Sequence, residues 1–226
     1  MKKITAYSEI VYIIGLMITA IGNALVSRAD FGMSMVVAPS YILHLKISEW
    51  LPFYSFGMSG YVFQGLLVIL TAIIVRRFRM TYLFSFITAV IFGLFLDTAL
   101  IPISLIPTDS IAVRIILMIV GLAIVPAGVS LLFNTYISPE AYELLVKEVS
   151  RKFGFETGRT KLVYDLSSLV LSIVLSLVLF KGSLIGIGIG TVISAFANGT
   201  LISAYLKMYK KFFEFRDLLP LRKHFE

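Results

Sequence analysis

The apolar residues of this chain come in six long blocks, and they follow neither an alternating nor a 3.6-residue pattern. The blocks cover residues 9–27, 55–75, 80–98, 113–133, 162–180 and 184–206. A helix needs roughly 20 mostly apolar residues to cross the hydrocarbon core of a bilayer, and it satisfies its own backbone amides there. The pattern therefore predicts an all-α polytopic membrane protein with six transmembrane helices.

Two connectors are long enough to hold further helices, and each follows the first block of its half of the chain. Residues 138–153 place leucines on one face and Glu and Lys residues on the other, after a Ser-Pro helix start. Residues 32–47 are more apolar and are interrupted by Pro39. We expect both to be interfacial helices, the second connector on the cytoplasmic side and the first near the outer leaflet.

The two halves of the chain repeat one another. The stretch GLMITAIGNALV at 15–26 returns as GLAIVPAGVSLL at 121–132, an offset of 106 residues. The third blocks keep this offset and the second blocks are offset by 101 residues. The pairs that carry the match are Gly15 with Gly121, Gly22 with Gly128, Gly57 with Gly158, Gln64 with Asp165, Thr88 with Ser194, Gly93 with Gly199 and Asp97 with Ser203.

Each half holds three blocks, and because three is odd, the second half must enter the membrane upside down. The sequence thus predicts a 3+3 inverted-topology repeat, an arrangement common among secondary transporters. We divide the chain into a first repeat (1–112), a second repeat (113–206) and a basic tail (207–226).

The charges fix an orientation on this map. The chain is 58% hydrophobic and 15% charged, and its net charge is +7. Of the 20 Lys and Arg residues, 16 fall on the side of the two termini and 4 on the other, so the positive-inside rule places both termini in the cytoplasm. The tail mixes basic and aromatic residues, which predicts contact with anionic lipid headgroups and gives no indication of nucleic acid binding.

Ionisable residues within membrane spans are costly and are the first candidates for function. Asp165 lies in the fifth block, with Lys161 one turn earlier on the same helix face and Arg159 at the predicted mouth. This group is interpreted as a gate or solute contact at the cytoplasmic side. The alternative is a structural ion pair that anchors the helix end.

Other polar residues inside the blocks extend the candidate site. Gln64 with Asp97 at the outer side and Asp165 with Asn198 at the inner side would suit two alternating gates. Asn23 and Asn198 are candidates for solute binding, or for hydrogen bonds between helices. Thr191 and Ser194 lie beside a face of small residues, where they could line a path or simply permit close packing.

No enzyme chemistry is visible in the sequence. It has no cysteine, and no Ser–His–Asp grouping, metal cluster or phosphate loop stands out. We therefore expect no catalytic residues, no metal and no cofactor.

Three segments resemble the YczE/YyaS/YitT-type bacterial membrane proteins: TGRTKLVYDLSS, GIGIGTVISAFANGTLI and the ADFGMS that follows the first block. The resemblance covers most of residues 10–206. It implies a bacterial cytoplasmic membrane protein of transporter-like type, with Asp165, Gly190 and Thr191 at recurrent positions. Many members carry GxSP where this chain has Gly32-Met33-Ser34-Met35, which leaves that loop without an implied role.

The sequence favours a permease that moves a small solute by alternating access. The basic residues at the mouth favour an anionic or zwitterionic solute. One alternative is a solute-binding subunit of an ATP-driven importer, docking through Ala20 and Ala24, and a homo-oligomer is also compatible. Another is a membrane scaffold or regulator that acts through the tail or through residues 138–153.

Overall fold

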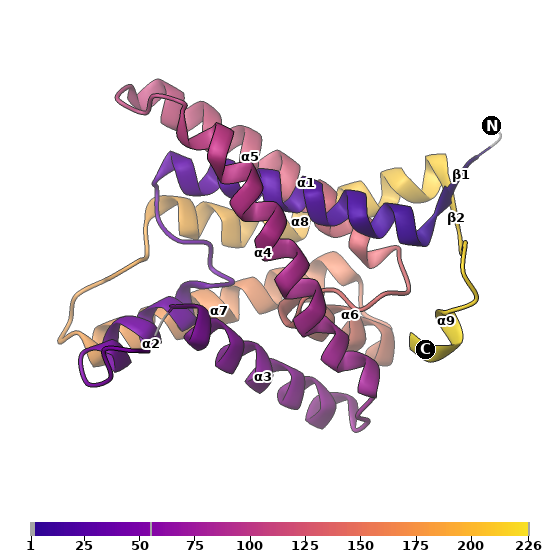
Figure 1. Ribbon diagram of the computed structural model, residues 1–226, viewed down its shortest axis with the longest axis horizontal. Helices are drawn as coiled ribbons and strands as arrows, with labels where there is room; N and C mark the ends of the chain where they lie inside the picture. Colours follow the sequence, from indigo (N-terminus) through magenta and orange to yellow (C-terminus); the bar gives the residue numbers. More distant parts are fainter. Residues whose placement is uncertain (1–2, 55, 226) are drawn as a thin grey trace.

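A computed structural model describes residues 3–54 and 56–225. Within this part of the chain, six helices are long and apolar enough to cross a membrane, as predicted (Figure 1). Ser55, where the second span was expected to begin, lies outside the described residues. The protein is a multi-pass helical membrane protein, and its long helices are α1 (Ser8–Ala29), α3 (Phe56–Val75), α4 (Phe84–Ser104, preceded by a 3-10 turn at Met80–Leu83), α5 (Ile111–Phe133), α7 (Thr157–Leu179) and α8 (Ile189–Phe212).

Three spans differ from the expectation by five residues or more. α7 begins at Thr157 instead of residue 162. α4 continues past residue 98 to Ser104, with Pro102 inside its last turn. α8 begins at Ile189 instead of residue 184, because Gly186 adopts a positive φ of 74° that breaks the helix there. Residues 207–212, which were assigned to the tail, continue α8.

The two connectors form helices, as expected, but α6 does not lie on a surface. α2 (Ala38–Ser48) and α6 (Ala141–Phe153) each pack against both α3 and α7. α6 buries residues from its apolar and its charged face alike, including Glu143 and Glu148. We expected one face of this helix to contact lipid and the other to contact water. Instead, the charged side chains of α6 contact partners on neighbouring elements. Lys152, for example, donates to the C-terminal carbonyls of α3 at Ile74 (2.9 Å) and Val75 (2.8 Å).

The helix contacts of one half are matched in the other. α1 packs along α5, the two helices that begin the halves, while α4 packs on α1 as α8 packs on α5. Each short helix contacts a long helix of the other half: α2 contacts α7, and α6 contacts α3. This is the pairing that two inverted repeats about a two-fold axis would give.

The glycines that revealed the repeat form the seam between α1 and α5. A Cβ added to Gly128 would lie 2.8 Å from the carbonyl oxygen of Gly15, and one added to Gly121 would lie 2.9 Å from that of Gly22. Since Gly15 corresponds to Gly121 and Gly22 to Gly128, the contacts are reciprocal, as they are in an isologous interface. Both backbones approach so closely that only glycine fits at these positions.

One contact breaks the match between the halves. α7 packs along α8, and a Cβ on Gly158 would lie 2.5 Å from the carbonyl oxygen of Gly199. In the first half, α3 and α4 make no comparably extensive contact, and Gly93, the counterpart of Gly199, has nothing within 4 Å of an added Cβ. The two halves therefore differ in one contact: α7 is packed against α8 in the second half, whereas α3 and α4 are apart in the first.

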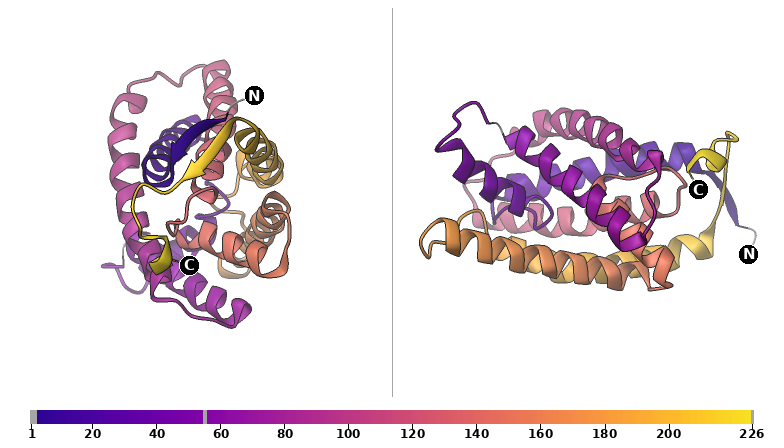
Figure 2. Two further views of the ribbon diagram at one scale, coloured as in Figure 1. Left: turned by 90° about the vertical axis from the view of Figure 1, so that its right-hand side faces the viewer. Right: turned by 90° about the horizontal axis from the view of Figure 1, so that it is seen from below.

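The end at which α1 begins and α8 ends, called the terminal end below, is covered by a pair of strands (Figure 2). β1 (Ile4–Tyr7) and β2 (Phe213–Arg216) pair in parallel, with Ile4 opposite Phe213. The chain after β2 folds back over this end and finishes in α9 (Arg222–Phe225). The carboxylate of Glu9 accepts hydrogen bonds from the backbone amides of Leu218 (3.0 Å) and Leu219 (2.9 Å).

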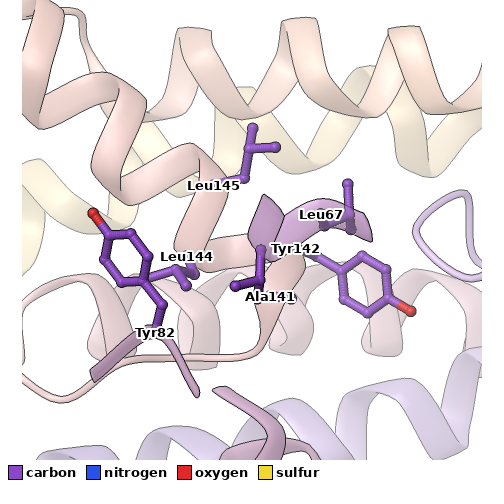
Figure 3. Close-up of a cluster of buried hydrophobic side chains, with 7 residues drawn as sticks. Leu67, Tyr82, Ala141, Tyr142, Leu144 and Leu145 are labelled. Carbon is purple, nitrogen blue, oxygen red and sulfur yellow. The ribbon is translucent and has the colours of Figure 1, made fainter. Parts of the chain in front are cut away.

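The largest buried apolar cluster lies where α3, α6 and the turn before α4 meet. Figure 3 shows Tyr82 and Tyr142 on opposite sides of Ala141 and Leu144. The Tyr82 hydroxyl donates to Glu148 (2.8 Å), so this cluster fixes both the apolar and the charged side of α6.

Candidate functional site

A cavity of about 510 Å³ lies between the two halves of the molecule. It extends inward from the end opposite the terminal end, called the far end below, where Asp30, Phe56 and Leu100 line it. The innermost lining residues come from α6 and from the first turns of α7, near the terminal end, and include Glu140, Glu143 and Lys161. The cavity is thus a deep pocket with a charged floor.

Lys161 is the central cation of this floor. Its ammonium nitrogen lies 3.0 Å from Asp165 Oδ1, one turn further along α7, and 3.3 Å from Glu143 Oε1 on α6. The Tyr164 ring lies 5.2 Å from the same nitrogen. The Lys161 residue is 2% exposed and Asp165 is fully buried, so each charge depends on the other for compensation.

Glu140 completes the floor and differs from its neighbours. It precedes the first turn of α6, it lines the cavity, and it forms no ion pair with any described residue. Burial raises the pKa of the Glu140 carboxyl well above its usual range, and the nearby Glu143 carboxylate adds to this, while Lys161 opposes it.

A hydrogen-bonded contact joins three segments near the floor, on the side of the terminal end. The hydroxyls of Tyr12 and Thr88 lie 2.6 Å apart, and Thr88 donates to the carbonyl oxygen of Ser138 (2.7 Å). These bonds join the first turns of α1 and α4 to the segment that leads into α6. The three segments are thus held together at the terminal-end side of the floor.

The structure brings four of the predicted site residues to this cavity. Lys161 and Asp165 form the predicted ion pair, with Lys161 lining the cavity and Asp165 behind it. Asn23 and Asn198 also line it. Asn23 donates to the carbonyl oxygen of Thr19 (2.9 Å), whereas Asn198 Oδ1 is buried without a partner among the described residues.

The other five predicted residues lie elsewhere. Arg159 faces outward and pairs with Glu156 (3.0 Å). Asp97 is exposed on α4 and Gln64 is buried on α3, and neither lines the cavity, so the expected outer gate pair is not assembled. Thr191 donates to the carbonyl oxygen of Met33 (2.6 Å) and so joins the start of α8 to the loop before α2. Ser194 donates to the carbonyl oxygen of Thr191 (3.0 Å) within α8.

Sequence reasoning missed Glu140, Glu143 and Tyr142, which all line the cavity. It assigned these glutamates to the water-facing side of an interfacial helix. The signal that could have found them is the repeat itself, because the two connectors occupy equivalent places and each enters the bundle beside the other half.

These features define a class of protein: a multi-pass helical membrane protein with a charged, central cavity between two related halves. The chain belongs to the family of unknown function DUF6198, whose model matches residues 6–207. No curated protein and no solved structure matches the chain.

Proposed function

We propose that this protein is a secondary transporter that carries a small solute across the membrane by alternating access, without changing it chemically. The observation that carries the proposal is the cavity, which lies between the two halves and is lined by residues of both. Solute sites of inverted-repeat transporters occupy this position. We also propose that the protein is related to the YczE/YyaS/YitT-type proteins and lies in a bacterial cytoplasmic membrane. Both termini would then be cytoplasmic, and the tail would contact anionic lipids.

The unequal halves support alternation between two states. In the present state, Gly158 and Gly199 press α7 against α8, while their counterparts Gly57 and Gly93 belong to α3 and α4, which do not pack along one another. If the halves exchange conformations, α3 closes on α4 and α7 separates from α8. The cavity would then approach the terminal end and be blocked from the far end.

Two equivalent positions can report this exchange. Leu96 of α4 and Ile202 of α8 are related by the offset of 106 residues, and both line the cavity. Leu96 is half-buried, whereas Ile202 is 1% exposed. Because the chain has no cysteine, Leu96→Cys and Ile202→Cys give single reporters for a membrane-impermeant maleimide applied to either side of the membrane.

The test is to disturb the closed contact. Gly158→Ala places a methyl group against Gly199 and Ser203, which destabilises the present state. We expect slower labelling of Leu96→Cys from its accessible side and faster labelling of Ile202→Cys from the opposite side. Gly93→Ala is the opposite variant, because its methyl group meets nothing within 4 Å in the present state but would obstruct closure of α3 on α4, so it should not speed labelling of Ile202→Cys.

Unchanged labelling rates in Gly158→Ala, or labelling rates that both rise as in a loosened protein, would contradict alternating access.

The anionic or zwitterionic solute expected from the sequence loses part of its support, because Arg159 faces away from the cavity. The importer alternative loses its proposed docking face, because Ala20 and Ala24 are fully buried. The regulator alternative through residues 138–153 is weakened by the burial of α6.

A further inference from the structure

We propose that the cavity binds an organic cation, a protonated amine with an apolar body, whose ammonium group pairs with Glu140. This inference rests on the proposed transport function for its biological meaning, but the binding it describes can be measured without transport. It replaces the anionic solute that the basic residues had suggested.

The first argument is the charge of the floor. Three carboxyl groups, on Glu140, Glu143 and Asp165, surround the single ammonium group of Lys161. Lys161 is already shared between Asp165 and Glu143. Among the described residues, an anionic solute would find no free cation on this floor, whereas a cationic solute would find in Glu140 a carboxyl group without an ion pair.

The second argument is the state of Glu140 itself. Glu140 is half-buried, and it has no ion-pair partner among the described residues. A carboxyl group held largely away from water in this way either keeps a proton or takes up a cation, because an isolated charge is disfavoured in a site of low dielectric. The groups that face Glu140 are Glu143 and the Tyr142 hydroxyl on α6, Lys161 on α7 and the Tyr12 hydroxyl on α1. Of these, Lys161 alone carries a positive charge, and it is paired with Asp165 and Glu143.

A third and independent observation is Asn198 on α8. The residue is 6% exposed and lines the cavity, and its Oδ1 has no hydrogen-bond partner among the described residues. A buried amide oxygen left without a donor is costly in free energy. An ammonium group carries several N–H donors and can satisfy this oxygen together with Glu140.

The walls and the volume point to an organic ion. Aromatic side chains line the cavity, and rings attract cations through their faces. A volume of about 510 Å³ falls within the usual range of small-molecule sites. The aromatic lining residues are Tyr41, Phe56, Phe92 and Tyr142.

The test compares three probes of one shape and different charge on the purified full-length protein: phenethylammonium, 3-phenylpropionate and 2-phenylethanol. Isothermal titration should detect binding of the ammonium probe and a weaker or undetectable response to the other two. Glu140→Gln should weaken ammonium binding by about tenfold to a hundredfold, as the loss of a charge-assisted contact does. Glu156→Gln, on the exposed start of α7, is the control and should leave the affinity unchanged.

The buffer gives a second readout that does not depend on a variant. Because a proton and the ammonium group compete for Glu140, ammonium affinity should fall as the buffer is made mildly acidic, and Glu140→Gln should lose this dependence. Preference for the carboxylate probe, no binding of the ammonium probe, or equal affinity in Glu140→Gln would overturn the inference. A different result separates the two proposals. If the ammonium probe binds but Gly158→Ala does not change the labelling rates of Leu96→Cys and Ile202→Cys, the proposed transport is overturned and the cation site still holds.

Discussion

At the scale of single residues, the distinctive feature is one buried cation that serves several carboxyl groups. Lys161 lies between Asp165 on its own helix and Glu143 on α6. Arg159, only two residues earlier, lies on another face of α7 and reaches the surface. This difference of two positions decides which of the two basic residues belongs to the site.

Replacing Lys161 should be strongly destabilising. Lys161→Met leaves the Asp165 carboxylate buried without its partner, and breaking a buried ion pair in this way costs about 3–5 kcal/mol. We expect a clear fall in the thermal unfolding temperature of the purified protein. The double variant Lys161→Met, Asp165→Asn removes both charges and should recover much of the loss. A double variant no more stable than the single one would contradict the role of this pair.

At the scale of helices, the seam between α1 and α5 depends on missing side chains. An added Cβ on Gly128 would lie 2.7 Å from the backbone nitrogen of Thr19, far inside a normal contact. The seam is therefore defined by backbone approach, which is how small residues hold membrane helices together.

Gly128→Ala should force α1 and α5 apart. Overpacking of this kind typically costs about 1–3 kcal/mol, so the unfolding temperature and the yield of folded protein should both fall. Gly60→Ala in α3 is the control, because its methyl group meets nothing within 4 Å and alanine favours a helix. Equal stability of the two variants would show that the seam does not limit stability.

At the scale of the whole molecule, the two ends of the chain close the terminal end together. Besides the strand pair, Ser8 donates to Asp217 (3.0 Å), and Tyr136 donates to Glu9 (2.7 Å). The Arg222 guanidinium beside Asp217 lowers the pKa of that carboxyl group. The tail thus packs on the protein through residues that the sequence had assigned to lipid contact.

Removing residues 213–226 should release β1. The backbone amides of Ile4–Tyr7 lose their partner strand, so their hydrogen exchange should approach the rate of a free chain, while exchange in the middle of α1 stays slow. Glu214→Gln, which alters only an exposed pair with Arg216, should leave β1 protected. Protection of β1 that survives the truncation would contradict this role of the tail.

The helices could be predicted from the sequence, whereas most residues of the candidate site could not. Long apolar blocks define spans almost regardless of their neighbours, and the repeated glycines revealed the repeat, although their contacts at the seam between α1 and α5 were not predicted. Lys161 with Asp165 was also predictable, because their spacing alone places them on one helix face. Glu140 and Glu143 could not be predicted as site residues, because a charged helix face has the same sequence pattern whether it contacts water or the buried charges of another helix.

The reciprocal glycine seam has a mechanical consequence. Since α1 and α5 touch backbone to backbone in the middle of the molecule, they cannot slide or tilt far without a collision and can serve as a rigid spine. If the protein alternates as proposed, the movement must be carried by the helices outside this pair, through closure of α3 on α4 and separation of α7 from α8. A ligand or antibody that holds α7 against α8 would then arrest the proposed cycle, whereas one bound to α1 and α5 would leave it free.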